Sequence, residues 1–210
     1  MELRASEIVA LHDAALVRWN APEGVDPTIA PSGGTPGPAE LLSAAHFANL
    51  MIWRLEDEAR RRDIGDARIA AIKRAIDPWN QRRNDLMEEI DAQILAGYAN
   101  VGGQRSELHS ETAGMIIDRL SILALKIHNM DRVAADAAGE GDRGLDEECR
   151  ARTLVLREQR KDLETCLARL LDDFAAGRRH FKVYRQMKSY NDDRLNPALR
   201  AVARRGRRGS

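Results

Sequence analysis

The chain has 210 residues, and its 33 basic and 33 acidic side chains give a formal net charge of +0 at pH 7. Such a balance excludes the one-signed field that draws a whole protein to nucleic acid or to an anionic membrane. Aromatic residues make up only 4% of the chain and alternating β-branched runs are absent, which argues against a β-sheet protein. The length suits a single domain with a sizeable core.

The cysteines and the N-terminal segment indicate the compartment. Cys149 and Cys166 are the only two cysteines. On one predicted helix they lie about 25 Å apart at 1.5 Å per residue, which is too far for a disulfide. The N-terminal MELRASEIVALHD is amphipathic and carries acids, unlike a signal peptide, and no charge-free apolar run is long enough to span a membrane. We expect a cytoplasmic protein with reduced thiols and no membrane partner.

The first three helices follow from the helical spacing of apolar residues. A first helix is expected over residues 3–19. Residues 20–38 hold five of the seven prolines and are interpreted as an extended loop. Further helices are predicted over 39–62 and 66–96. Within the latter, Asp77-Pro78 marks either a kink or a new start with Asp77 as the N-cap.

The most informative segment of the chain is ETAGMIIDRLSILALKIHNM, residues 111–130. Its apolar side chains point in nearly every direction around a helix, which predicts a nearly fully buried fourth helix capped by Ser110 or Thr112. Yet the same segment carries Asp118, Arg119, Ser121 and Lys126. Burying a charge is costly unless the charge is paired, hydrogen-bonded or used. We therefore expect an internal polar site along this helix.

A long fifth helix is predicted over residues 146–176, after a flexible loop at 134–145 and before a shorter segment at 178–190. The expected fold is an all-α, single-domain bundle of five to six helices. We divide the chain into an N-terminal helix plus Pro/Gly-rich loop, a bundle core, and a basic tail expected to be disordered, at residues 1–38, 39–197 and 198–210. Apart from a weak RNA or phosphate contact of that tail, nucleic acid is not an expected partner.

Helical steps of three and four gather polar residues on one face of the second helix, namely His46, Asn49, Trp53, Glu56 or Asp57, and Arg60. An ordinary solvated face is the alternative interpretation. A tryptophan in the middle of such a face would be unusual, so His46, Asn49 and Trp53 are taken as ligand-binding candidates.

The third helix carries amides and acids beside its apolar seam. Asn80 and Asn84 are poor helix formers and join the ligand-binding candidates. Glu88 and Asp91 are three residues apart, so their carboxylates converge and can share a divalent cation such as Mg²⁺. Such pairs also occur on exposed helices without any function. The candidates for metal binding or catalysis are Glu56, Asp57, Glu88 and Asp91, and no other cofactor is indicated.

In the fifth helix, Arg160 occupies a heptad position where an apolar residue belongs. We expect it to pair with a buried acid, Asp118 being the leading candidate. The alternative is that its aliphatic stem carries the charge out to solvent. Arg160 joins the ligand-binding candidates, as do Asp118, Arg119 and Lys126 of the fourth helix.

After the fifth helix, cations alternate with aromatic residues, a pattern that suits a ligand bearing a phosphate or a ring. A helix anchored by its aromatic side chains, with a solvated basic side, is the alternative. The candidates in this segment are Arg185, Lys188, Tyr190 and Asn191. Elsewhere the sequence contains no glycine-rich phosphate loop, zinc-ligand spacing or serine nucleophile elbow.

Five segments resemble, in the same order, the bacterial domain of unknown function 4254 family: HFANLMIWRLEDEAR, IKRAIDPWNQRRNDLMEEID, SETAGMIIDRLSILALKIHNM, CRARTLVLREQRKDLETCLARLLDD and GRRHFKVYRQMKSYNDDRLNP. The resemblance covers roughly residues 40–197. It implies a compact helical protein of about this length, and no reaction, because the family is uncharacterised. Pro78 and the Thr112-Ala113-Gly114 turn depart from the family's pattern. The matching polar residues are Asn49, Trp53, Glu56, Asp57, Arg60, Asp77, Asn80, Asn84, Asp85, Asp91, Asp118, Arg119, Lys126, Arg160, Lys188, Tyr190 and Asn191.

These features predict a charged internal pocket for a small anionic ligand containing phosphate or sugar, with or without metal assistance. Arg160, Arg185 or Lys188 would stabilise negative charge. One alternative is a structural or partner-binding protein, for instance a homodimer, whose buried charges form a closed network that fixes helix register. A second is a metal-dependent enzyme like the all-α nucleoside triphosphate pyrophosphohydrolases, by analogy with their acidic pairs on adjacent helices. Whether the protein is an enzyme stays open at this point.

Overall fold

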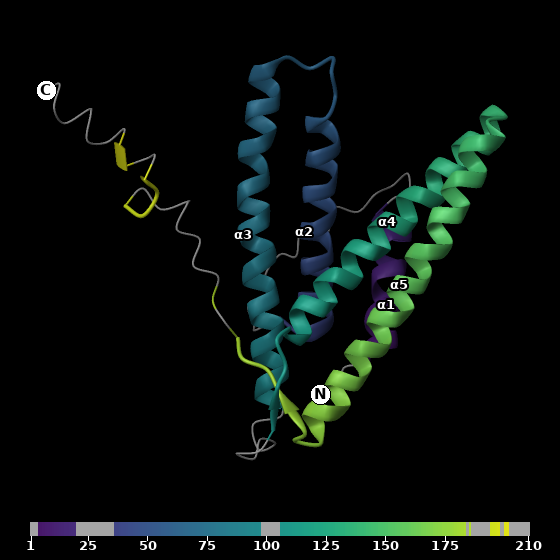
Figure 1. Cartoon of the computed structure of the whole chain (residues 1–210). Coiled ribbons are helices and arrows are strands. Elements are labelled where there is room, and N and C mark those ends of the chain that lie inside the picture. Colours follow the sequence, from purple (N-terminus) through teal and green to yellow (C-terminus); the bar gives the residue numbers. More distant parts are fainter. Residues whose placement is uncertain are drawn as a thin grey trace, which may run out of the picture.

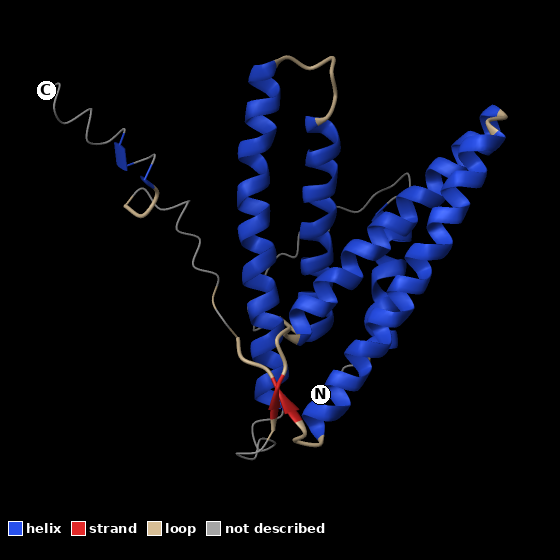
Figure 2. Cartoon of the chain, in the orientation of Figure 1, coloured by secondary structure: helices blue, strands red, loops and turns tan. Residues whose placement is uncertain are grey.

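The structure, a computed structural model, describes residues 4–19, 36–97, 106–183, 185, 194–197 and 200–201. Its helices are α1 (Ala5–Trp19), α2 (Pro38–Ala59), α3 (Asp66–Gly97), α4 (Ala113–Glu140) and α5 (Arg143–Ala175). Two strands of two residues each, β1 (Glu107–Leu108) and β2 (Arg179–His180), pair in parallel (Figure 2). The expected all-α class is confirmed, and the short strand pair is an addition that the sequence did not predict. No described helix combines the length and apolarity needed to cross a membrane.

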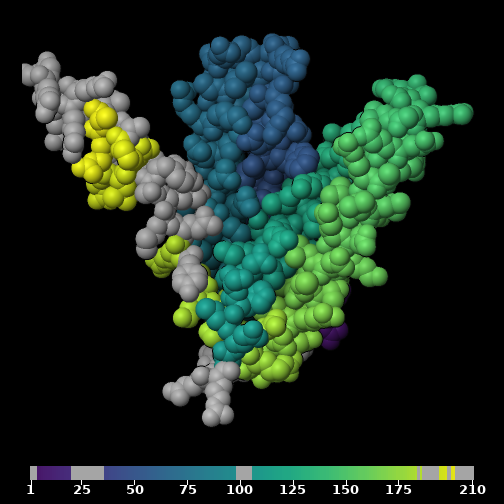
Figure 3. All heavy atoms as spheres, viewed as in Figure 1, coloured from purple at the N-terminus to yellow at the C-terminus, as the bar shows by residue number. Residues whose placement is uncertain are grey.

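The helices form two hairpins that diverge like the arms of a V (Figure 1). One arm is α2 with α3, the other is α4 with α5, and α1 packs against α4, α2 and α5. The arms meet where the first half of α4 joins the others in a shared core built around Leu86, Ile116, Leu120 and Leu167. Beyond this junction the two arms separate, and a hollow opens between them (Figure 3).

The start of α4 packs closely against α3 at Gly114. Thr112 is the N-cap, and its Oγ1 accepts a hydrogen bond from the Met115 backbone N–H at 3.2 Å. A Cβ added to Gly114 would lie 2.8 Å from the carbonyl oxygen of Met87 and 2.9 Å from the Asp91 carboxylate. Side chains do not tolerate such distances to backbone, so only glycine lets the two helices approach this closely.

Burial along α4 is uneven. Most of the buried residues of α4 lie between Ala113 and Ile127, and only Ala134 and Ala137 are buried beyond them. Arg119 and Lys126 are exposed in the middle of this stretch. The charges on α4 therefore divide into one that is buried, Asp118, and two that reach solvent.

The prediction of a flexible loop at residues 134–145 is wrong. α4 continues to Glu140, Gly141 ends it in the left-handed conformation with φ of 80°, and α5 follows from Arg143. Alanines, which are the strongest helix formers, dominate residues 134–138 and outweigh the glycines that suggested a loop. In α3 the helix likewise continues through Pro78 rather than restarting there.

After α5, the chain turns at Gly177 and forms β2 rather than a helix. Phe181 is buried and stacks on Phe174 with ring centroids 5.0 Å apart. This contact anchors the segment to the end of α5. Lys188, Tyr190 and Asn191 lie outside the described residues.

Candidate functional site

A chain of buried polar side chains crosses the junction between α2 and α4. His46 is fully buried, and its Nδ1 lies 2.7 Å from the Ser121 hydroxyl. The Asn49 side-chain amide donates to Ser121 Oγ at 3.0 Å and to Asp118 Oδ1 at 2.8 Å. One helical turn separates His46 from Asn49, and another separates Asp118 from Ser121, so the four side chains face each other in register.

Arg83 of α3 completes this chain. Its Nε donates to Asp118 Oδ1 at 2.7 Å and its Nη2 donates to Asp118 Oδ2. The Asp118 side chain is 5% exposed and the Arg83 side chain 26% exposed. The carboxylate of the pair is therefore buried, whereas the arginine reaches solvent. A two-pronged arginine–carboxylate contact is among the strongest polar contacts in proteins. The sequence prediction missed Arg83, although it lies between the two conspicuous amides Asn80 and Asn84.

The expected pairing of Arg160 with Asp118 is wrong. Arg160 Nη1 lies 2.8 Å from the Asp13 carboxylate, and its Nη2 donates to the Val9 carbonyl at 3.1 Å. Both partners belong to α1, which packs over α5 at this point. The side chain of Arg160 is only 12% exposed, in agreement with its predicted position on the packed face of the helix.

Next to Arg160, two histidines are buried without charge. The ring centroids of His12 and His46 lie 4.5 Å apart, and both residues are fully buried. Burial is the main cause that lowers the pKa of His46 to about 3, with the Arg160 charge acting in the same direction and the His12 backbone opposing it. Burial, His46 and Arg160 lower the pKa of His12 well below its ordinary value. Both rings are therefore neutral at pH 7.

Asp91 binds the start of α4. Its Oδ1 accepts a 2.7 Å hydrogen bond from the Gly114 backbone N–H. Burial raises the pKa of Asp91 to about 6, and Glu88 adds to the rise, while hydrogen bonds from Thr112 and Gly114 oppose it. The carboxylate at the positive end of a helix is a capping group. No group of three or more histidine, cysteine or acidic side chains gathers as a metal site within the described residues.

A cleft of about 300 Å³ lies at the junction of the two arms, beside the Arg83–Asp118 pair. It is lined by residues of α2, α3 and α4, namely Asn49, Ile52, Trp53, Glu56, Asp57, Arg60, Arg83, Ile122 and Leu125. Four of the predicted site residues are among them, because the polar face predicted for the second helix borders this cleft. We call this hollow the junction cleft.

The junction cleft combines charged side chains with a buried donor, the Trp53 indole, that has no partner in the part of the chain that the structure describes. Glu56 Oε2 lies 2.8 Å from Lys73 Nζ and 3.2 Å from Arg60 Nη1. The Trp53 indole Nε1 is buried and bonds to none of the described residues. A buried donor without a partner is unfavourable, so it marks a position where a ligand acceptor would be stabilising.

A second hollow, of about 650 Å³, lies between α4 and α5 and is named the α4–α5 hollow. Arg119 and Lys126, two further predicted site residues, line it. Ile122 borders both this hollow and the junction cleft, so the two are neighbours on either side of that side chain. The other lining residues are His109, Glu111, Ile116, Leu123, Gln159, Asp162, Leu163 and Cys166.

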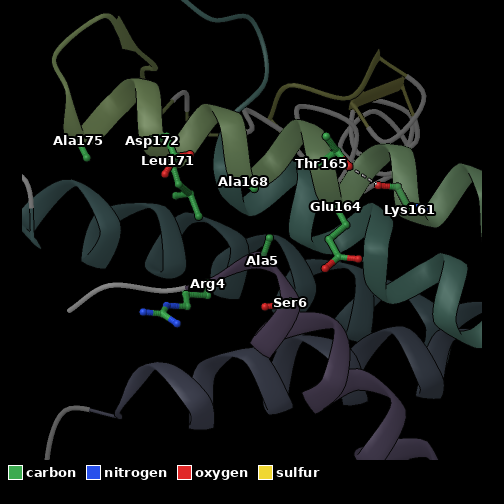
Figure 4. Close-up of a pocket in the computed structure, with 10 residues that line it drawn as sticks. All are labelled: Arg4, Ala5, Ser6, Lys161, Glu164, Thr165, Ala168, Leu171, Asp172 and Ala175. Carbon is green, nitrogen blue, oxygen red and sulfur yellow. Dashed lines mark hydrogen bonds between the residues drawn. The ribbon is translucent and has the colours of Figure 1, made fainter.

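The other predicted residues lie apart from the junction cleft. Asn80 is half-buried and Asn84 buried on α3, and neither lines the cleft. Arg185 is exposed. Another hollow, of about 570 Å³ between the start of α1 and α5, contains no predicted site residue (Figure 4). The one bond drawn there runs within α5, from the Thr165 hydroxyl to the Lys161 carbonyl.

Residues 39–183, which include every residue of the junction cleft, match the family described as "Protein of unknown function (DUF4254)". The chain belongs to the DUF4254 family. The match begins after α1, so the DUF4254 region comprises α2 to α5 and the strand pair. Comparisons with curated proteins and with solved structures found no match.

Proposed function

We propose that the junction cleft binds a small molecule that carries both an anionic group and hydroxyl groups, of the class of sugar phosphates. The observation that carries this proposal is the guanidinium of Arg83 at the cleft. Asp118 takes up Nε and Nη2, and no described residue bonds Nη1. Because Asp118 is itself held by Asn49, the guanidinium is oriented before any ligand arrives, which lowers the entropic cost of binding.

The other cleft residues supply what a sugar phosphate requires. Arg60 and Arg83 provide donors for phosphate oxygens. Glu56 and Asp57 are acceptors for sugar hydroxyl groups. Apolar side chains, among them Ile122, offer a surface for the sugar ring. The volume of about 300 Å³ is at the small end for ligand sites, which favours a monosaccharide.

The test is calorimetric titration with a hexose 1-phosphate, with free hexose and inorganic phosphate for comparison. Trp53→Phe keeps an aromatic side chain but removes the unpartnered N–H together with the fused five-membered ring, and it should weaken binding about tenfold. The melting temperature, measured alongside, separates lost binding from lost packing. Arg150→Gln, an exposed cation on α5, is the matched control and should bind as the unaltered protein does. Absence of binding by any hexose phosphate, or equal binding by Trp53→Phe, contradicts the proposal.

A closed structural network is the second candidate function, and one observation favours it. The buried charges at the junction have internal partners: Asp118 has Arg83 and Asn49, and Asp91 has the start of α4. Such a network would fix helix register without a ligand. Replacing Arg83 and Asp118 together by Met and Leu distinguishes the two, since a purely structural pair tolerates an apolar exchange, whereas a ligand site loses its binding.

The metal-assisted alternative stays a prediction from the sequence. Of its four acids, Glu56 and Asp57 line the junction cleft, whereas Asp91 caps α4. Titration of the protein with Mg²⁺ in the presence and absence of hexose 1-phosphate tests it directly.

A further inference from the structure

We infer that the ligand of the junction cleft is a nucleoside diphosphate sugar, whose nucleoside occupies the α4–α5 hollow. This inference rests on the proposed function and names its substrate class. The two hollows border the same side chain, Ile122, so a molecule with two ends can occupy both by crossing α4 at that residue.

The two hollows differ in size as the two ends of such a molecule do. The junction cleft, of about 300 Å³, accommodates a monosaccharide, while the α4–α5 hollow, of about 650 Å³, has room for a nucleoside. Side chains in the larger hollow also suit a base. Ile116, Leu123 and Leu163 provide an apolar surface for its ring, and Gln159 and Asp162 provide the amide and carboxylate that recognise ring N–H and carbonyl groups.

Cations flank the crossing point on both sides. Arg83 stands on the junction-cleft side, and Arg119 and Lys126 stand on the side of the α4–α5 hollow. Arg119 is held by Glu111 at 2.8 Å, whereas Lys126 has no ion pair with any described residue. A diphosphate is the group that such an arrangement binds, because two linked phosphates place their oxygens against cations several ångströms apart.

The arrangement also accounts for a feature of α4. Arg119 and Lys126 are charged residues on a helix whose first half is otherwise mostly buried, and they lie two helical turns apart on one face with Ile122 between them. This face lies beside that of Asp118, which orients Arg83 at the junction cleft, and Ile122 is the residue between them. One helix thus offers a carboxylate that orients an arginine and, on an adjacent face, two cations, of which Arg119 is paired with Glu111.

The test compares two classes of ligand by calorimetry on the full chain. One is hexose 1-phosphate, and the other comprises the uridine, guanosine and adenosine diphosphate hexoses. We expect at least one diphosphate hexose to bind about tenfold or more tightly than hexose 1-phosphate, because the second hollow adds contacts. Lys126→Gln should lower the affinity for that diphosphate hexose about tenfold. The affinity for hexose 1-phosphate should change by no more than about twofold. Lys161→Gln, an exposed cation elsewhere on α5, is the control.

Three outcomes overturn the inference. If hexose 1-phosphate binds and no diphosphate hexose binds more tightly, the second subsite is wrong while the proposed function stands. If Lys126→Gln and Arg119→Gln weaken both ligands equally, the cations act by general attraction rather than at a subsite. If a diphosphate hexose binds but Trp53→Phe leaves its affinity unchanged, the ligand does not enter the junction cleft, and the proposed function fails as well.

Discussion

Asp91 and Asp118 are two carboxylates buried to the same degree at contacts of α4, one on α3 and one on α4 itself. Asp91 pairs with no cation among the described residues. It accepts hydrogen bonds at the start of a helix, and burial raises its pKa to about 6. Asp118 meets the full charge of Arg83 and the amide of Asn49. Burial alone therefore does not identify a functional acid, because its partners decide whether it caps a helix or orients an arginine at a cleft.

The largest effect should come from the glycine that lets Asp91 reach α4. Gly114→Ala brings a Cβ to 2.8 Å from the Met87 carbonyl, so α4 must shift away from α3. We expect a loss of about 3–4 kcal/mol in the free energy of unfolding, measured by urea denaturation. Gly139→Ala in the same helix is the control, since nothing lies within 4 Å of the added carbon, and it should be neutral or stabilising by about 0.5–1 kcal/mol. Equal behaviour of the two variants would refute the close-approach argument.

Asp118→Ala tests the other carboxylate. It leaves Arg83 and Asn49 without their acceptor, which should cost about 3 kcal/mol of unfolding free energy, at the low end for a broken buried pair because Arg83 is partly solvated. A double-mutant cycle with Arg83→Ala measures the coupling between the two side chains. An additive cycle would show that the pair contributes nothing beyond its separate members.

Asp91→Asn should have a smaller effect of the opposite sign at neutral pH. Because the folded-state pKa of Asp91 is raised, its contribution to stability is present below about pH 4 and is lost as the pH rises through about 6. The asparagine cannot ionise, so the variant should be about 2 kcal/mol more stable than the unaltered protein at pH 7 and equal to it near pH 4. Unfolding measured across this range checks the prediction, with the exposed Asp77→Asn as control. A variant less stable at pH 7 would mean that the charge stabilises α4.

The buried histidines should make the protein less stable as the pH falls, the opposite of the pH dependence expected for Asp91. Because the folded-state pKa values of His12 and His46 are lowered, their contribution is fully present above about pH 6.5 and is lost as the pH falls below it. His12→Phe removes one of these groups and should reduce the loss of stability between pH 7 and pH 5 by about 2 kcal/mol. Unfolding is followed by tryptophan fluorescence, to which Trp19 contributes with its ring 5.1 Å from that of His46. An unchanged pH dependence would show that His12 is accessible to protons in the folded state.

Prediction from sequence succeeded where the signal is local. The stripe Asn49, Trp53, Glu56 and Asp57 lies along one wall of the junction cleft, as helical spacing indicated. Thr112 was one of two predicted caps and is the one observed. Prediction failed for Arg160 because its partner depends on which helix covers it, and nothing in the spacing of α5 indicates that α1 does so. It missed Arg83 because an arginine on a helix surface is ordinary until a buried carboxylate is found opposite.

The five helices, most of their ends and their polar faces follow from local sequence signals, because periodicity, capping and helix propensity act between residues a few positions apart. Three further features come from the packing of the helices: Asp118 faces Arg83, Asp91 binds the start of α4, and Arg119 and Lys126 line a different hollow. These pairings join residues far apart in the chain. They depend on how the two arms cross, and that crossing is set by packing at the junction, where Gly114 permits an approach that no other residue would allow.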